Sequence, residues 1–249
     1  MTGGDLRALR LHERDALVLD FDGTLAPIGP DPDAVMLPHG AAEALHGLSR
    51  RLGGAVAVLS GRDLRDLARR VPAGLWRAGG HGTEILPPHA PPPPAPPPPP
   101  EALLAPLREA ARHEGVWIEI KGPVVALHYR AAPEAGPACL EAAGRAAAAL
   151  PGHKAQPGKM VVEVKPLAAD KGLALRSLMD RSAFAGRRPV MVGDDATDED
   201  AMEAALALGG VAVKVGEGPS VAAWRAADPA AVLAWLGREA AAPLQGKAP

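Results

Sequence analysis

The chain has 249 residues, enough for one large domain or two small ones, and its 27 basic side chains nearly balance 29 acidic ones. This balance argues against nucleic-acid binding driven by bulk charge, and the single cysteine, Cys139, excludes a disulfide framework and a thiolate metal site. No run approaches the roughly 18 uninterrupted apolar residues of a membrane span, and the N-terminus lacks the apolar core of a signal peptide. We therefore expect a cytoplasmic protein that binds neither nucleic acid nor membrane.

The first predicted element is a strand at residues 16–19, whose four apolar residues suit a strand buried on both faces of a parallel sheet. Asp20 and Asp22 follow directly, and because they are two positions apart they can share one side while Phe21 points to the other. Two carboxylates a few ångströms apart repel unless a cation or a shared proton compensates, and Mg²⁺ prefers oxygen ligands. The pair therefore indicates a magnesium site, with a solvated acidic junction as the simpler alternative.

Strands and helices alternate from there to residue 82, which is typical of a doubly wound sheet. The predicted elements are a proline-rich loop at 27–38, a helix at 41–52, a strand at 55–59, a helix at 63–70, and a strand that runs into a glycine-rich turn at 75–82. Ser60, Gly61 and Arg62 follow the second strand, where a hydroxyl and backbone amides can hold a phosphate.

Residues 87–100 read PPHAPPPPAPPPPP, a run that can form neither a helix nor a central strand. We expect an extended polyproline II spacer that acts as a semi-rigid connector between domains. The alternative is a docking site for proline-recognition modules, and the connector is the interpretation that we favour.

A compact unit with the order helix, strand, strand, helix, strand follows the spacer. Its predicted elements are a helix at 101–114, strands at 116–120 and 124–129, a helix at 134–150, a turn at 156–158 and a strand at 160–164. The doubly wound pattern then resumes with a helix at 170–182, a strand at 189–192, an acidic loop, a helix at 199–208 and a strand at 211–215. The predicted domains are a sheet domain at 1–88, a linker at 89–100, an inserted domain at 101–167 and the remainder of the sheet domain at 168–249.

Two further chemical signals lie in the resumed sheet domain. Lys171 opens a helix, and residues 194–200, which follow a strand, hold five acids in seven residues. Taken singly, a lysine in a first helical turn is usually solvated, and acids before a helix can be caps alone. Together with Asp20 and Ser60, these two signals favour a ligand site over surface charges and helix caps, because ligands bind where the ends of strands meet in an open sheet.

The chain resembles the haloacid dehalogenase (HAD) type phosphatases in the ordered set Asp20-Phe21-Asp22-Gly23-Thr24, Ser60, Lys171 and Gly193-Asp194-Asp195. Longer pieces narrow the resemblance to the trehalose-6-phosphate phosphatases, namely DFDGTLAPI, SGR, GGHGTEI, EIKGPVVALHYR, GKMVVEVKP, DKG and GDDATDEDAM. The first element alone is common to many chemistries, whereas the combination is far more specific. The resemblance implies an α/β fold: a HAD-type Rossmann-like core with a doubly wound parallel sheet, plus a small inserted α/β cap domain.

The resemblance also implies a magnesium-dependent phosphatase mechanism. Asp20 would be the nucleophile that forms an aspartyl-phosphate, and Asp22 the acid that protonates the departing sugar oxygen and then the base that activates water. Mg²⁺ would bind Asp20, Asp194 and the backbone carbonyl of Asp22, with Asp195 and Asp198 close by as ligands or as support.

Other residues would bind the phosphosugar. The groups expected at the phosphoryl oxygens are Thr24, Ser60, Gly61, Arg62 and Lys171. The groups expected to face the sugar are His81, Glu119, Lys121, His128, Arg130, Lys159 and Glu163. For each of these sugar candidates the alternative is packing or solvation on a small sheet. Gly80 stands before His81, where a polar side chain was expected.

The expected activity is hydrolysis of trehalose 6-phosphate to trehalose and phosphate. Another phosphosugar, such as sucrose phosphate or a mannosyl phosphoglycerate, would keep the chemistry and change the specificity. A non-catalytic sugar-phosphate sensor or scaffold is the third possibility, but such a protein would be expected to lose a nucleophile or a metal ligand. Asp20, Asp22, Lys171 and Asp194 are all present.

Overall fold

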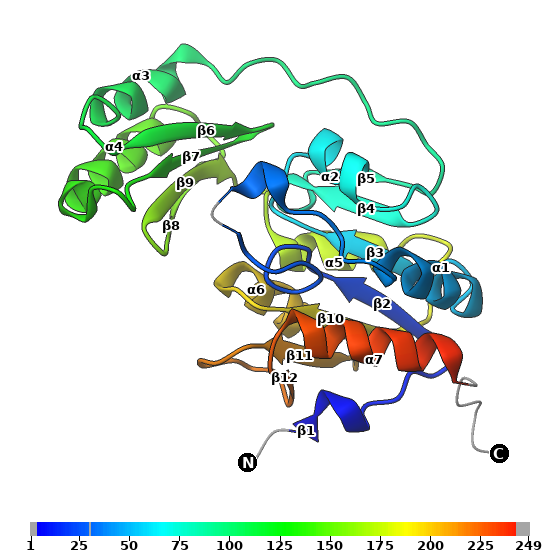
Figure 1. Cartoon of the computed structure of the whole chain (residues 1–249). Helices are drawn as coiled ribbons and strands as arrows, with labels where there is room; N and C mark the ends of the chain where they lie inside the picture. Colours follow the sequence, from blue (N-terminus) through cyan, green and yellow to red (C-terminus); the bar gives the residue numbers. More distant parts are fainter. Residues whose placement is uncertain (1–3, 30, 243–249) are drawn as a thin grey trace. The chain divides into compact units, whose positions relative to one another are not determined.

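The computed structural model describes residues 4–29 and 31–242, so residue 30 in the predicted loop at 27–38 lies outside the described residues. The chain divides into two compact units (Figure 1). The core unit comprises Met1–Ser60, Leu64–Pro92 and Asp170–Pro249, and the inserted unit comprises Gly61–Asp63 and Pro93–Ala169. One boundary falls within the proline-rich run, and residues 87–100 contain no helix or strand.

An eight-stranded sheet forms the centre of the core unit, in the order β1-β12-β11-β10-β2-β3-β4-β5. Its strands are β1 (Gly4–Asp5), β2 (Asp15–Leu19), β3 (Val56–Leu59), β4 (Trp76–Gly79), β5 (Glu84–Leu86), β10 (Arg188–Gly193), β11 (Val211–Val215) and β12 (Trp224–Ala226). Neighbouring strands are parallel except β4 and β5. Every residue of β2 is buried, as expected for a parallel strand covered on both faces.

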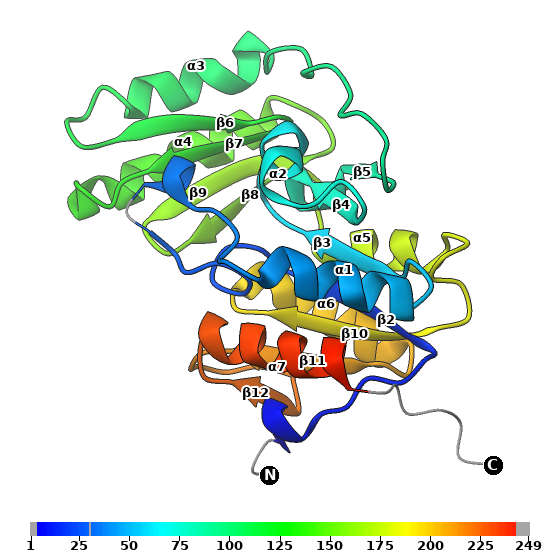
Figure 2. The same cartoon turned by 45° about the vertical axis from the view of Figure 1, so that its right-hand side comes forward.

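Helices cover both faces of this sheet. They are α1 (Ala41–Arg51), α2 (Leu64–Arg70), α5 (Lys171–Met179), α6 (Ala196–Ala207) and α7 (Pro229–Ala241), with 3₁₀ turns η1 (Leu6–Ala8), η2 (Pro32–Ala34) and η3 (Gly80–Gly82). Figures 1 and 2 show α1 and α7 side by side on one face and α5 and α6 on the other. The doubly wound α/β core expected from the sequence is therefore confirmed.

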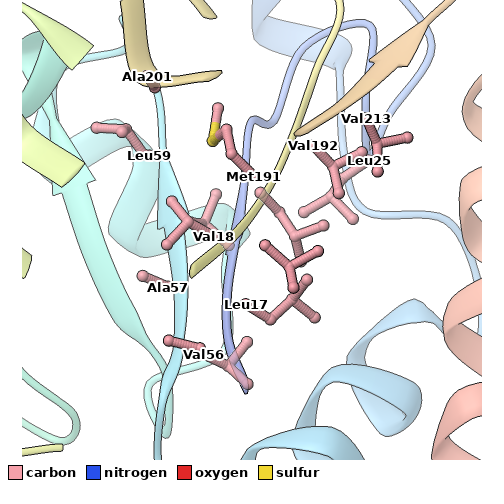
Figure 3. Close-up of a cluster of buried hydrophobic side chains, with 14 of the residues drawn as sticks. Leu17, Val18, Leu25, Val56, Ala57, Leu59, Met191, Val192, Ala201 and Val213 are labelled. Carbon is pink, nitrogen blue, oxygen red and sulfur yellow. The ribbon is translucent and has the colours of Figure 1, made fainter. Parts of the chain in front are cut away.

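The apolar runs of the central strands form the core that fixes this sheet. Figure 3 shows side chains of β2, β3 and β10 gathered in one cluster, with Leu17 and Val18 beside Val56 and Met191. These four side chains have no measurable exposure. Because burial of each such side chain contributes about 1.5–3 kcal/mol, the strands that carry the acidic ends are held rigidly.

A four-stranded antiparallel sheet forms the inserted unit, in the order β6-β7-β9-β8. Its elements are β6 (Trp117–Lys121), β7 (Val124–His128), β8 (His153–Gly158), β9 (Val161–Pro166), α3 (Glu101–Ala110), α4 (Gly136–Ala148) and the 3₁₀ turn η4 (Pro133–Ala135). Helices α3 and α4 pack together and against one face of the sheet, where leucine, valine and alanine side chains form a separate hydrophobic cluster. The opposite face carries the polar side chains of β6, β7 and β9.

The predicted turn at 156–158 and the predicted strand start at Met160 are both wrong. Residues 156–158 belong to β8, which pairs with β9 and places Pro157 opposite Val162. Because β8 is an edge strand, Pro157 can lack an amide donor without breaking the sheet. The chain reverses after β8, with Met160 at a left-handed φ of 61°. The inserted unit therefore has a fourth strand that the prediction missed.

Several helix boundaries also differ from the prediction. The predicted helices at 101–114 and 170–182 end sooner, at Ala110 and Met179, and the helix predicted from residue 134 begins at Gly136 after a 3₁₀ turn. The helix predicted from residue 199 begins at Ala196, because its cap lies within the acidic loop. Helix α7 was not predicted, although Asp228 before Pro229 is an ordinary helix start.

Candidate active site

The centre of the core sheet brings two acidic segments together. β2 and β10 are parallel neighbours with Leu19 opposite Val192, and the amide of Asp20 donates to the carbonyl of Val192 at 2.9 Å. The chain continues from β2 to β3 on one side and from β10 to β11 on the other, so the strand order reverses between them. Asp20 and Asp194 thus follow strand ends at a switch point, where open α/β sheets bind ligands.

Lys171 lies between two of the buried acids. It is the first residue of α5, whose start is capped by the side chain of Asp170. Only 3% of Lys171 is exposed, and its Nζ donates to Asp20 Oδ1 at 2.8 Å and to Asp198 Oδ1 at 2.7 Å. From the sequence alone, Lys171 could have been a solvated surface charge. In the structure it is a buried ion-pair partner of Asp20, the predicted nucleophile.

Asp198 holds the acidic loop in place. Its Oδ1 accepts from Lys171, while its Oδ2 accepts from the amides of Asp194 and Asp195 at 3.0 and 3.1 Å. Asp195 is used differently, because its Oδ1 caps α6 by accepting from the amides of Thr197 and Asp198. The two acids thus form a capping box at the start of α6, and the helix start fixes the position of Asp194.

Three carboxylates meet at this point. Among the described residues, Asp20, Asp194 and Asp198 form a group whose carboxylate oxygens lie within 4.8 Å of one another. Neither Asp22 nor Asp195 contributes to this group. Three acids against the single ammonium of Lys171 leave an excess of negative charge, and carboxylate oxygens are the donors that a hard divalent cation prefers. The donor set therefore fits Mg²⁺.

Burial and the charge of neighbouring carboxylates raise the pKa of all three carboxyl groups. For Asp20 burial is the main cause and the charge of Asp198 adds to it, and for Asp194 burial is joined by the charge of Asp195. Burial raises the pKa of Asp198 to about 7, against the lowering effect of Lys171. Burial alone would lower the pKa of Lys171, but the carboxylates of Asp198 and Asp20 outweigh it and raise that pKa. Lys171 is therefore permanently charged.

Gly23 makes room for Asp194. Its φ of +85° is left-handed, and a Cβ built there would lie 2.3 Å from Asp194 Oδ2. The neighbouring Thr24, which is fully buried, donates from Oγ1 to Asp194 Oδ1 at 3.3 Å. The turn after β2 therefore contacts the acid that follows β10, and only glycine allows this approach.

Lys214 is a residue of this site that sequence reasoning missed. It lies in β11, is 5% exposed, and donates from Nζ to the backbone carbonyl of Asp194. Its Nζ also lies 3.7 Å from Glu199 Oε1. A single lysine within the otherwise apolar strand 211–215 was the available signal, since a buried charge needs a partner.

The remaining predicted core residues lie around the ends of β2 and β3. Asp22 is half-buried and forms a bridge with Ala26 in the turn after β2. Ser60 is buried directly after β3, and its carbonyl accepts from the amide of His81 at 3.0 Å. His81 is itself buried in η3, with a left-handed φ of 55°. Gly61 and Arg62 are half-buried and belong to the inserted unit.

Four of the predicted sugar-binding residues form one network on the open face of the inserted sheet. His128 Nε2 lies 2.8 Å from Glu119 Oε2, and Lys121 Nζ lies 3.4 Å from Glu119 and 3.5 Å from Glu163. Burial raises the pKa of Glu119, but the hydrogen bond with His128 and the charge of Lys121 lower it by more. Of the other three candidates, His81 lies in η3 of the core unit, and Arg130 and Lys159 are exposed and are not part of this network.

Trp117 also belongs to this face and was missed. It lies opposite His128 in the pairing of β6 with β7, and the two rings stack with centroids 4.0 Å apart and planes within 9°. The signal was its position two residues before Glu119, because alternate residues of a strand share a face.

The fold and the buried acid–lysine cluster define a HAD-type phosphatase. A family model described as trehalose-phosphatase matches residues 18–230, and the chain belongs to the trehalose-phosphatase family. It is 37% identical over 236 residues to trehalose-6-phosphate phosphatase of Escherichia coli (strain K12), covering 91% of this chain and 86% of that protein. It is 41% identical over 209 residues to a probable trehalose-phosphate phosphatase of Sinorhizobium fredii, covering 81% and 77%.

Solved structures show the same fold. The C-terminal domain of Candida albicans trehalose-6-phosphate phosphatase superposes with a TM-score of 0.79 and 21% identity, covering 97% of this chain and 99% of that one. Aspergillus fumigatus trehalose-6-phosphate phosphatase superposes with a TM-score of 0.63 and 26% identity, covering 92% and 93%. The family expected from the sequence is therefore confirmed.

Replacement of Gly23 by alanine should destabilise the core unit more than the same change at Gly54. Both residues have a left-handed φ, +85° and +86°, which costs an alanine about 1–2 kcal/mol. At Gly54 nothing lies within 4 Å of the added Cβ, whereas at Gly23 it would collide with Asp194. Urea unfolding of both variants measures the difference. Equal losses in the free energy of unfolding would show that the Asp194 side chain moves aside at no cost.

Proposed function

We propose that this chain hydrolyses trehalose 6-phosphate to trehalose and inorganic phosphate through an aspartyl-phosphate on Asp20. The observation that supports this most directly is the cluster of buried Asp20, buried Lys171 and half-buried Asp194 at adjacent strand ends of a trehalose-phosphatase family member. A non-catalytic sensor is not favoured, because nucleophile, lysine and acids are all in place and the matched relatives bear phosphatase names.

In the first step, a carboxylate oxygen of Asp20 attacks phosphorus and the bond from phosphorus to the sugar oxygen breaks. Lys171, which donates to Asp20 Oδ1, fixes the orientation of that carboxylate and offers positive charge to the phosphoryl oxygens. Asp22 gives its proton to the leaving sugar oxygen, so that trehalose departs as a neutral alcohol. Ser60 is a hydroxyl donor directly after β3, where it can bind a phosphoryl oxygen, whereas the hydroxyl proton of Thr24 goes to Asp194.

In the second step, the Asp22 carboxylate takes a proton from a water molecule, and the oxygen of that water attacks the phosphorus of the aspartyl-phosphate. The bond from phosphorus to Asp20 breaks, which releases inorganic phosphate and restores the Asp20 carboxylate. Residues that hold Asp20 therefore serve both steps. Asp198 acts as a positioning residue, because its oxygens are taken up by Lys171 and by the amides of the acidic loop.

Mg²⁺ is the cofactor that the donor set fits, with Asp20, Asp194 and the backbone carbonyl of Asp22 as its proposed ligands. When bound, it supplies positive charge against the phosphoryl oxygens and lowers the repulsion between substrate and acids. Asp195 and Asp198 support this site from the start of α6. Asp194 is oriented for such a role by Thr24 and by Lys214, which holds its backbone carbonyl.

The inserted unit is proposed to bind the sugar as a cap. The network of Glu119, Lys121, His128 and Glu163 offers carboxylate acceptors and ammonium and imidazole donors on one open face, which is what several sugar hydroxyls require. The further proposed sugar contacts are His81, Arg130 and Lys159, of which the last two are exposed. Another phosphosugar, such as sucrose phosphate, would be distinguished at these residues. Gly61 and Arg62 are proposed to bind the phosphoryl group beside Ser60.

The proposed domain limits remain 1–88, 101–167 and 168–249, with residues 89–100 as a semi-rigid connector. Among the described residues, no helix is long and apolar enough to cross a membrane. We propose a cytoplasmic enzyme whose partner is a small phosphosugar.

Release of phosphate from a panel of phosphosugars tests the activity. With Mg²⁺ present, we expect kcat/KM for trehalose 6-phosphate to exceed the value for glucose 6-phosphate by about tenfold or more, because a disaccharide can contact more polar groups of the inserted sheet. It should also exceed the value for sucrose 6-phosphate, because sucrose places the hydroxyls of its second ring differently against the same fixed groups. Equal values for all three esters would refute the substrate assignment while leaving the phosphatase chemistry intact.

Asp20→Asn should abolish turnover, because an amide oxygen is a poor nucleophile and cannot form the aspartyl-phosphate. We expect kcat to fall by about 10³-fold or more. The matched control is Asp180→Asn, which changes an exposed carboxylate at the end of α5 and should keep the activity of the unaltered protein. Substantial turnover by a folded Asp20→Asn protein would show that another residue is the nucleophile.

Mg²⁺ should stabilise the protein more at pH 8 than at pH 5.5. Between the ordinary pKa of 3.8 and about 7, folded Asp198 holds a proton that the unfolded chain has lost, so its contribution to stability is lost as pH rises through 7. A bound cation needs deprotonated Asp20 and Asp194, whose pKa values are also raised, and its positive charge offsets the cost of ionised Asp198 beside them. Thermal unfolding with and without Mg²⁺ measures both effects, and Asp194→Asn should abolish the metal-dependent shift. A shift independent of pH would place the metal elsewhere.

A further inference from the structure

The outer strand of the inserted sheet presents an aromatic side chain on its polar face. Along β6, Ile118 packs against the hydrophobic cluster beneath the helices, whereas Trp117 does not take part in that cluster. Half of Trp117 is exposed. The inserted unit has one other large aromatic residue, Tyr129, and it is buried at 8% exposure. Trp117 is thus the aromatic surface that this unit offers to solvent.

Trp117 is also held in a fixed orientation. Its indole stacks nearly flat on the imidazole of His128, at 4.0 Å and 9°. His128 is fixed in turn by Glu119, whose Oε2 lies 2.8 Å from Nε2. One side of the indole is therefore supported by a ring that is itself hydrogen-bonded, and the rest of the side chain is free to contact a ligand. An aromatic surface oriented before binding loses little conformational entropy when a ligand stacks on it.

The polar network lies on the same face. Glu119 is two residues from Trp117 on β6, and Lys121 is two residues further and bridges Glu119 to Glu163 of β9. A pyranose ring has the complementary chemistry, since its C–H faces are apolar and its rim carries hydroxyl groups. Ligand sites of this kind combine an aromatic surface with a few fixed polar groups.

We propose that Trp117 is a sugar-stacking residue, on which the second hexose ring of the substrate lies while its hydroxyls bond to Glu119 and Lys121 of the same strand. This inference rests on the proposed function, because it assigns the face of the inserted sheet that would recognise a disaccharide phosphate. Trp117 then determines preference for a disaccharide over a single phosphorylated hexose, which lacks the second ring. His128 is a positioning residue that acts by supporting the indole.

Steady-state kinetics of Trp117→Ala, Trp117→Phe and Ile120→Ala tests the proposal. Ile120 is the matched control, because it is on the same strand, is 52% exposed and points away from the polar face. In Trp117→Ala we expect KM for trehalose 6-phosphate to rise about five- to tenfold, with kcat within about twofold, since one aromatic contact is lost. The preference over glucose 6-phosphate should fall by the same factor. Phenylalanine should restore most of the affinity, and Ile120→Ala should behave as the unaltered protein.

Tryptophan fluorescence during titration with trehalose supplies a readout that does not depend on turnover. The sugar should change the emission of the unaltered protein and of Trp224→Phe, whose tryptophan lies in the core unit, but not of Trp117→Phe. An unchanged emission in all three proteins, or a KM in Trp117→Ala within twofold of the unaltered value, would overturn the proposal. If the unaltered protein does not prefer trehalose 6-phosphate, the proposed function fails, and the trehalose titration still decides whether Trp117 binds sugar.

Discussion

The ammonium of Lys171, held between two buried carboxylates, is the interaction on which the core unit depends. A buried charge is costly unless it is paired, and here the partners come from different elements, with Asp20 after β2 and Asp198 within α6. The pairing therefore joins α5 to the central strand and to the neighbouring helix. Gly172 lets the helices come this close, because a Cβ there would lie 2.6 Å from the carbonyl of Asp200.

The same cluster is electrostatically incomplete, which separates a reactive site from a structural ion pair. Three carboxylates meet around one ammonium, and burial raises their pKa values. A structural pair would be balanced by one acid for each base, as Asp15 and Arg188 are at the opposite end of β2 and β10. The surplus of acid lies instead at the carboxyl ends of these strands, where a divalent cation and an incoming phosphate together would restore neutrality.

Much of the core site could be predicted because its signals are local and its geometry follows from topology. Apolar runs placed β2 and β10, and parallel strands in a doubly wound sheet bring their carboxyl ends to one edge, so Asp20 and Asp194 could be expected to meet. The roles of the other acids could not be separated, because a cluster of five acids does not reveal which of them cap α6. Only the hydrogen bonds of Asp195 and Asp198 to the helix start do so.

Features that depend on pairing between elements were missed. β8 is stabilised by pairing with β9, which overrides the turn tendency of Pro157 and Gly158 at a sheet edge. The role of Lys214 depends on its contact with Asp194, which follows the neighbouring strand β10. In each case the sequence gives the residue type, but only the structure gives the contact that explains it.

The two units meet different electrostatic requirements, and this difference follows from the ligands proposed for them. Phosphate brings negative charge, so the core acids need a cation, and Lys171 is buried to keep its charge unscreened. A sugar brings no charge, so the charged groups of a site for it must already have partners before it binds. On the inserted sheet they do, because Lys121 lies between Glu119 and Glu163, and His128 bonds to Glu119. These groups are only partly buried, so hydroxyls can replace water at their remaining bonding positions without separating a buried ion pair.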